Sequence, residues 1–279
     1  MNFVTTDWLD AHLGDADLRV IDASWHMPAT GRRGDLEFLE GHIPGAVCFN
    51  IDVIADVSSN LPHMLPKSEA FARAMGELGL GDGMRFVVYD SLGLFSSARV
   101  WWTLRAYGAR EVHILAGGLP KWKTEGRALV AGEARIVPAV FTPRLAPGAA
   151  LAVDQVKAAL AAGGQVVDAR PADRFEGRAP EPRPGLKSGH MPGALNLPFG
   201  ELVAHGCLKP KADLIAAITA HGVDLTRPAI TTCGSGVTAA IIGLAIEEAG
   251  GTFAGLYDGS WAEWGARGDC AVATGPDKG

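Results

Sequence analysis

The sequence predicts an α/β protein made of two tandem domains, each with a mostly parallel sheet flanked by helices. Three observations support this prediction. The chain has 279 residues, more than most single hydrophobic cores contain. Four segments of the first half recur in the second half. In both halves, short apolar runs alternate with helical patterns, as expected when helices cover a parallel sheet.

The repeats indicate a duplicated fold. Matched segments lie between 142 and 148 residues apart and keep the same order along the chain. The pairs are 18–24 with 165–170, 40–46 with 188–194, 86–90 with 229–233, and 117–122 with 259–264. We therefore predict one domain over residues 1–138 and a second over residues 151–279. Segment 139–150, rich in Pro, Ala and Gly, is the predicted linker.

Each half is expected to repeat one succession of strands and helices. The apolar runs that end at Asp22, Asp90, Asp168 and Cys233 are predicted strands. Helical patterns cover Lys67–Leu80, Lys211–Gly222 and Val237–Ala249. Ligands of open parallel sheets bind beyond the carboxyl ends of the strands. We therefore expect the functional site near such an end, in the cleft between the two halves.

Cys233 carries the clearest chemical signal. It ends a β-branched run, is followed by Gly234 and Gly236, and leads into a predicted helix. Backbone N–H groups and the positive end of a helix macrodipole stabilise a thiolate at such a place. The other cysteines lack this setting and are interpreted as small buried hydrophobes: Cys48, Cys207 and Cys270. The first half has Asp90 in the matching position, so that domain is predicted to be non-catalytic.

Composition excludes several classes of function. A net charge of −6 and a pI near 5.7 argue against nucleic acid or an anionic membrane as the main partner. Four widely spaced cysteines form neither a disulfide framework nor a zinc motif. No signal peptide or membrane-spanning run is visible, so we expect a soluble protein of the reducing cytoplasm. No metal or organic cofactor is implied, because no ligand cluster or phosphate-binding glycine motif occurs.

The duplicated pattern, the two Gly-His-x-Pro-Gly-Ala segments and the cysteine loop resemble the tandem-domain rhodanese family of sulfurtransferases. The resemblance covers essentially the whole chain and implies two rhodanese-like domains. Loop 233–238 is similar to the 3-mercaptopyruvate sulfurtransferase type, whereas thiosulfate-preferring rhodaneses carry Arg and Lys after the cysteine. By this resemblance, four loop residues line the donor site: Gly234, Gly236, Val237 and Thr238.

Charge supports the same division within the family. Thiosulfate is a dianion whose charge lies next to the transferred sulfur, so a basic loop suits it. Mercaptopyruvate carries its carboxylate away from its sulfur and suits a remote guanidinium. The resemblance implies that Arg174 and Arg183 hold the donor's carboxylate and carbonyl. The alternative is that these arginines pair with Glu176 and Glu181 as ordinary surface charges, and we expect this for Arg178.

The resemblance also implies a proton relay of Asp52, His63 and Ser235. A histidine oriented by a carboxylate is the usual proton-transfer group near neutral pH. The alternative is that His63, in a proline-bounded loop, only caps a turn. His42 and His190 occur in both halves, including the one without the cysteine, so we interpret them as structural.

These residues imply a two-step transfer. The Cys233 thiolate attacks the sulfur of 3-mercaptopyruvate, giving a persulfide and releasing pyruvate. A thiophilic acceptor, which is cyanide, a thiol or a thioredoxin-like protein, then takes the outer sulfur. A thiosulfate sulfurtransferase and a non-catalytic persulfide carrier remain alternatives. A phosphatase is disfavoured, because Ala239 stands where the phosphate would need an arginine.

Overall fold

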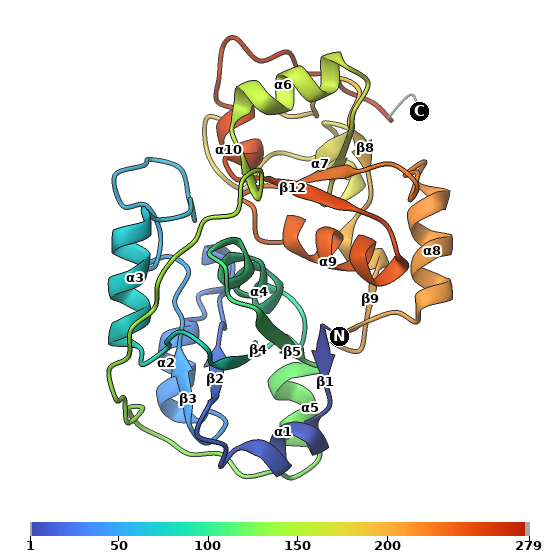
Figure 1. The fold of residues 1–279 in the computed structure, drawn as a ribbon. Helices are drawn as coiled ribbons and strands as arrows, with labels where there is room; N and C mark the ends of the chain where they lie inside the picture. Colours follow the sequence, from blue (N-terminus) through green and yellow to red (C-terminus); the bar gives the residue numbers. More distant parts are fainter. Residues whose placement is uncertain (1, 277–279) are drawn as a thin grey trace. The chain divides into compact units, whose positions relative to one another are not determined.

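The computed structural model describes residues 2–276, which divide into two compact units (Figure 1). The first unit holds the chain through Val57, together with Leu65–Ala146 and His205–Cys207. The second unit holds Ser58–Met64, Pro147–Ala204 and residues 208–276. Each unit thus includes a short segment from the other half of the sequence.

The first unit is a five-stranded parallel sheet in the order β1-β5-β4-β2-β3. Its strands are β1 (Phe3–Val4), β2 (Leu18–Asp22), β3 (Ala46–Cys48), β4 (Arg85–Tyr89) and β5 (Glu111–Leu115). Its α-helices are α1 (Thr6–His12), α2 (Gly34–Glu40), α3 (Ser68–Glu77), α4 (Ser96–Ala106) and α5 (Gly118–Thr124), and a 3₁₀ turn covers Pro28–Thr30.

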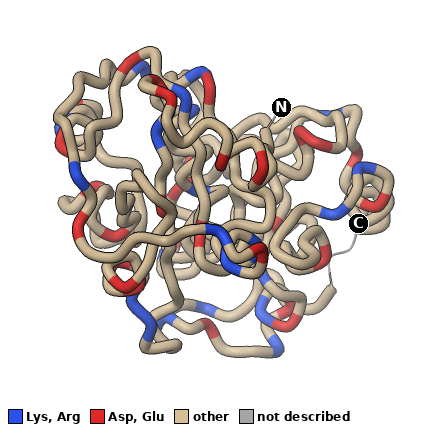
Figure 2. The backbone as a smooth tube through the Cα atoms, turned by 90° about the horizontal axis from the view of Figure 1, so that it is seen from below, with Lys and Arg blue, Asp and Glu red and all other residues tan. Residues whose placement is uncertain are grey.

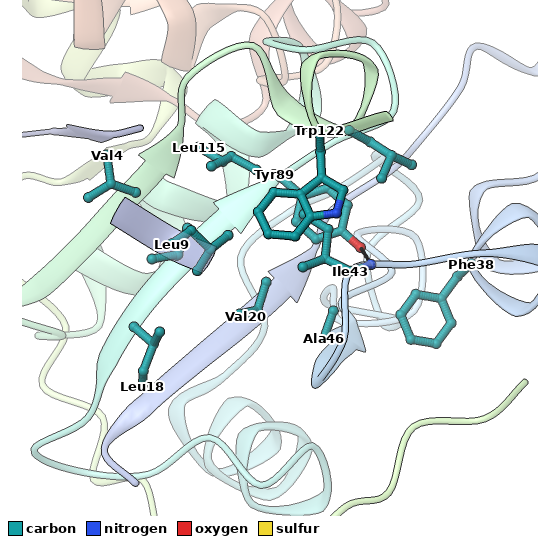
Figure 3. Packing of buried hydrophobic residues seen from close by; sticks show 12 residues of the cluster. Val4, Leu9, Leu18, Val20, Phe38, Ile43, Ala46, Tyr89, Leu115 and Trp122 are labelled. Carbon is teal, nitrogen blue, oxygen red and sulfur yellow. Dashed lines mark hydrogen bonds between the residues drawn. The ribbon is translucent and has the colours of Figure 1, made fainter. Parts of the chain in front are cut away.

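One face of this sheet packs against α1, α2 and α5 (Figure 3). Every second strand residue points to this face, as the period of a strand requires, and Val20 and Tyr89 are among them. The indole of Trp122, from α5, is fully buried here. The hydroxyl of Tyr89 accepts the backbone N–H of Ile43 at 3.2 Å, which satisfies a polar atom inside the core.

The second unit repeats this topology with the order β6-β12-β11-β7-β8, again all parallel. Its strands are β6 (Ala150–Leu151), β7 (Gln165–Asp168), β8 (Leu195–Asn196), β11 (Ala229–Thr232) and β12 (Phe253–Tyr257). Its helices are α6 (Val153–Ala161), α7 (Ala172–Phe175), α8 (Lys211–Ala220), α9 (Ala239–Ala249) and α10 (Ser260–Trp264), with a 3₁₀ turn at Phe199–Glu201. Strands β9 (Val203–Ala204) and β10 (Cys207–Leu208) form a separate two-stranded sheet.

The predicted fold of two parallel sheets flanked by helices is therefore confirmed, with small differences at helix ends. Helices α3 and α8 stop before Gly79 and Gly222, whose φ angles of 69° and 75° lie in the left-handed region that ends a helix. Helix α9 begins at Ala239 rather than at the predicted Val237. The loop still turns at Gly236, with φ 78°, and Thr238 is the N-cap residue.

The two repeated histidines, His42 and His190, contact backbone carbonyl groups. Nδ1 of His42 lies 2.8 Å from the carbonyl oxygen of Phe38, and Nδ1 of His190 lies 2.9 Å from that of Phe175. Each imidazole stacks on the ring of the same phenylalanine, with centroids 3.8 and 3.9 Å apart. Both residues are buried. These contacts support the structural interpretation of the two histidines.

Charged positions are interspersed along the backbone, so the net negative charge is not gathered in one stretch (Figure 2). Over residues 2–276, no helix has both the length and the apolar character needed to cross a membrane.

Candidate active site

Cys233 lies at the carboxyl end of β11, the middle strand of the second sheet. It is buried, with 2% of its surface exposed. Residues 233–238 form a loop between β11 and α9, and the backbone N–H of Gly236 donates to Sγ at 3.1 Å. This N–H is placed to donate to negative charge that develops at the sulfur during a reaction.

Backbone N–H groups at the start of α10 donate to carbonyl oxygens of the cysteine loop. The N–H of Trp261 donates to the carbonyl oxygen of Cys233 at 2.9 Å, and the N–H of Ala262 donates to that of Gly234 at 3.0 Å. Because both loop carbonyls are engaged, the peptide planes on either side of the sulfur have a defined orientation.

Ser260 adds a side-chain contact to the same loop. Its hydroxyl donates to the carbonyl oxygen of Tyr257 at 2.9 Å and accepts the N–H of Cys233 at 3.5 Å. Ser260 has a φ of 50°, in the left-handed region that costs free energy for a residue with a side chain. The matched residue in the first unit is Gly118, with a φ of 53° and no such cost.

Asp90 shows what the same loop does in the first unit. Its carboxylate is buried and accepts three backbone N–H groups, from Leu92 at 2.8 Å, Phe95 at 2.7 Å and Ser97 at 2.9 Å. The loop between β4 and α4 is thus a cradle for an anion, and the chain supplies that anion itself. The matching loop around Cys233 has the same positions in strand and helix, with sulfur in place of the carboxylate.

Arg174, on α7, brings a guanidinium to the cysteine loop. A Cβ atom added to Gly234 would lie 3.2 Å from Nη2 of Arg174. The guanidinium of Arg174 therefore lies directly beside Gly234. Arg174 also pairs with Glu181, whose Oε2 lies 2.5 Å from Nη2. The predicted alternative pairing with Glu181 therefore exists, while the same guanidinium also lies next to the loop.

The other two arginines of this segment differ in setting. Arg178 is exposed, and its Nε donates to Glu176 at 2.5 Å, which is the surface ion pair expected for it. Arg183 lies half-buried in an irregular segment of the second unit. Its role toward a donor stays a prediction.

Comparison with known proteins places the chain in a family. The rhodanese-like domain family matches it twice, over residues 5–125 and 152–267. The chain belongs to the rhodanese family. The 3-mercaptopyruvate sulfurtransferase of Escherichia coli strain K12 is 45% identical over 272 residues, which is 97% of each chain. Thiosulfate/3-mercaptopyruvate sulfurtransferase 2 of Arabidopsis thaliana is 42% identical and matches 94% of this chain and 83% of its own length. The crystal structure of Escherichia coli SseA superposes with a TM-score of 0.86 at 42% identity, covering 94% of this chain and 99% of that one.

In this rhodanese, Cys233, Ser235 and His63 belong to the same compact unit, and all three are buried. His63 comes from the first half of the sequence, yet its segment is part of the second unit. Its φ of 58° is unusual for a residue other than glycine. Asp52 belongs to the first unit, where its Oδ2 accepts the indole N–H of Trp25 at 2.8 Å. Its part in the predicted relay stays a prediction.

Two further predicted site residues, Val237 and Thr238, lie in the loop between β11 and α9. Val237 is buried, with 3% of its surface exposed, and Thr238 begins the turn into α9. Among the described residues, no group of three or more His, Cys, Asp or Glu side chains is arranged to hold a metal ion.

Sequence reasoning missed three residues around the site: Arg170, Glu181 as a partner of both arginines, and Ser260. A signal was present, because the internal repeat pairs Arg170 with Ser24 and Ser260 with Gly118. Where the two halves of a duplicated chain differ, the difference can mark the half that carries the chemistry.

A cavity of about 570 Å³ lies at the amino ends of the strands of the second sheet. It is lined by Gln165, the first residue of β7, and by the exposed pair Asp224 and Arg227. Because all strands of the sheet are parallel, these amino ends lie opposite the carboxyl ends, where Cys233 is found. We therefore assign the site by the cysteine loop and not by the cavity.

The structure predicts that Cys48 is unreactive in the folded protein. Burial raises the pKa of its thiol to about 12, and the nearby carboxylates of Asp22 and Asp35 add to the shift. At pH 8 only about one such thiol in ten thousand is ionised, and the thiolate is the reactive form. We expect iodoacetamide at pH 8 to leave Cys48 unmodified until urea unfolds the protein, as read by peptide mass mapping. Equal labelling rates in the folded and unfolded protein would contradict this.

Proposed function

We propose that this chain is a sulfurtransferase that takes sulfur from 3-mercaptopyruvate onto Cys233 and passes it to a thiophilic acceptor, releasing pyruvate. The observation that carries the proposal is the cysteine loop, with a backbone N–H on the sulfur and the Arg174 guanidinium beside Gly234. The 45% identity to a 3-mercaptopyruvate sulfurtransferase over nearly the whole chain supports it.

In the first step, the Cys233 thiolate attacks the sulfur of the donor. A sulfur–sulfur bond forms, the carbon–sulfur bond of the donor breaks, and its electron pair passes to carbon as the enolate of pyruvate. The proton of the donor's thiol then suffices to convert the enolate to pyruvate, which leaves a persulfide anion on Cys233. The Gly236 N–H is placed to stabilise negative charge at the sulfur throughout.

Ser235 and His63 are the proposed carriers of that proton, and both are buried in the cysteine-bearing unit. Arg174 and Arg183 are proposed to hold the donor's carboxylate and carbonyl. Glu181 engages Nε and Nη2 of Arg174, at 3.4 and 2.5 Å, so the Nη1 hydrogens lie outside this pair and suit a carboxylate.

In the second step, a nucleophilic acceptor attacks the outer sulfur of the persulfide. The sulfur–sulfur bond breaks and its electron pair returns to Cys233 as the thiolate, ready for the next donor. Cyanide or a small thiol satisfies this chemistry, as does a reduced thioredoxin-like protein.

The test is kcat/KM for 3-mercaptopyruvate and for thiosulfate, each with cyanide as acceptor. We expect a clear preference for 3-mercaptopyruvate, because residues 234–238 carry no charge of their own and the adjacent Arg174 guanidinium is shared with Glu181. A preference for thiosulfate would reject the donor assignment and favour the thiosulfate activity that the name of the Arabidopsis relative also gives. Turnover of neither donor would favour a persulfide carrier.

A further inference from the structure

Four charged side chains form a buried chain in the second unit that ends at the cysteine loop. Asp168 pairs with Arg170 through contacts of 2.7 to 3.1 Å. Nη1 of Arg170 donates to Oε1 of Glu181 at 2.8 Å, and Glu181 in turn holds Arg174. Arg174 is the member that lies beside Gly234.

The inner members of this chain have almost no access to water. The side chains of Asp168, Arg170 and Glu181 are each 1% exposed, whereas that of Arg174 is 19% exposed. If Glu181 moved away from Arg170, both charges would be left buried and unpaired, which costs free energy. Glu181 therefore stays between the two guanidinium groups. Arg174 is therefore anchored at its inner edge and open at its outer edge.

Arg170 also connects the charged chain to the backbone of the loop. Its guanidinium lies over the ring of Trp261, 4.1 Å from the centroid, and donates to the carbonyl oxygen of Gly189 at 2.9 Å. Trp261 is the residue whose N–H holds the Cys233 carbonyl. Burial by itself would lower the pKa of Arg170, but Asp168 and Glu181 outweigh it, and the pKa lies above its usual value.

The first unit shows that the fold does not need an arginine at the position of Arg170. Ser24 stands there in the position of Arg170, and its hydroxyl accepts the N–H of Ser91 at 2.9 Å. Asp22 occupies the position of Asp168 and is also buried, so the second unit differs by Arg170 and its pairing with Glu181. Because burying ion pairs rarely stabilises a fold more than apolar packing does, this pairing calls for a role at the site.

We propose that Glu181, fixed by Arg170, is a positioning residue that holds the Arg174 guanidinium beside the cysteine loop for the donor's carboxylate. The inference rests on the proposed function, since it requires Arg174 to bind the donor. A planar guanidinium held by two bonds to a carboxylate has a defined orientation, whereas a free arginine side chain samples many rotamers.

The test is a double-mutant cycle of Glu181→Gln and Arg174→Ala, assayed with 3-mercaptopyruvate and cyanide. Glutamine keeps the size of Glu181 and removes its charge. We expect Glu181→Gln to lower kcat/KM about ten- to hundredfold, mainly through KM, as the loss of a charged hydrogen bond would. In the Arg174→Ala background the same change is expected to have no further effect. The rate of Cys233 alkylation by iodoacetamide, a neutral reagent, is expected to stay unchanged.

Glu176→Gln is the matched control, because it removes the partner of the exposed Arg178 in the same segment. We expect its kinetics to equal those of the unchanged protein. Arg170→Lys is a second test of the same role, because it keeps the buried charge and removes the planar guanidinium. We expect it to lower kcat/KM, and we expect no further fall when it is added to Arg174→Ala.

The outcomes separate the two ideas. If Arg174→Ala raises KM but Glu181→Gln does not, or if the two losses multiply, Glu181 does not act through Arg174 and the positioning role is overturned. If Arg174→Ala leaves KM for 3-mercaptopyruvate unchanged, the donor-binding role of Arg174 in the proposed function is overturned, and the positioning role with it.

Discussion

Replacing Cys233 with serine is expected to abolish sulfur transfer from 3-mercaptopyruvate. The sulfur that forms the persulfide is lost, and a serine hydroxyl is a far weaker nucleophile near neutral pH, so we expect a fall in kcat of roughly 10³-fold or more. Pyruvate release measures the loss. Mass spectrometry of the protein after donor alone reports the persulfide, which we expect on the unchanged chain and not on the variant.

Cys207→Ser is the control for this experiment. Cys207 is a half-buried thiol whose pKa is raised by burial, and it lies on β10, away from the β11–α9 loop in the sequence. We expect this variant to retain activity and to form the persulfide. Sulfur transfer that persists in Cys233→Ser would contradict the whole persulfide mechanism.

Replacing Arg183 with alanine is expected to cause the second-largest loss. A charge-assisted hydrogen bond to a carboxylate is worth about 1.5–3 kcal/mol, which corresponds to about a ten- to hundredfold fall in kcat/KM for 3-mercaptopyruvate. We expect most of the change in KM, because the contact is to a part of the donor that does not react. Initial rates over a range of donor concentrations separate the two constants.

Arg178→Ala is the matched control for Arg183→Ala. It removes the same charge from the same segment, but its guanidinium is exposed and paired with Glu176. Surface ion pairs contribute little, so we expect unchanged kinetics. Equal kinetics in both variants would mean that Arg183 does not contact the donor, and the assignment of the donor's carboxylate would rest on Arg174 alone.

Much of the architecture was predictable, because the chain repeats itself. Apolar runs at matched positions gave both sheets, and the break in periodicity after Thr232 located the cysteine loop. Helix ends were less accurate: α9 starts two residues later than its apolar pattern, since Val237 is buried in the loop and not on the helix. An apolar side chain fits either environment, so periodicity alone could not separate them.

The site was predictable only in part. Cys233 followed from local sequence, because a thiol between a strand and a glycine turn is defined by neighbours in the chain. The pairing of Glu181 with both Arg170 and Arg174 did not follow, although the sequence offers Glu181 as a partner for a nearby arginine. Which of several nearby charges meet depends on how the segment after α7 folds back, and that is set by burial rather than by spacing.

The sequence by itself determined the duplicated α/β fold and the position of Cys233 between a strand and a glycine turn, and it predicts that the domain carrying Asp90 is non-catalytic. These properties depend on short-range patterns and on comparison of the two halves. Only the tertiary structure decided which unit receives His63, that the Asp90 carboxylate fills its own cradle, and that a buried ionic chain ends at Gly234. Those outcomes depend on which polar groups are removed from water together, and only the packed chain specifies that.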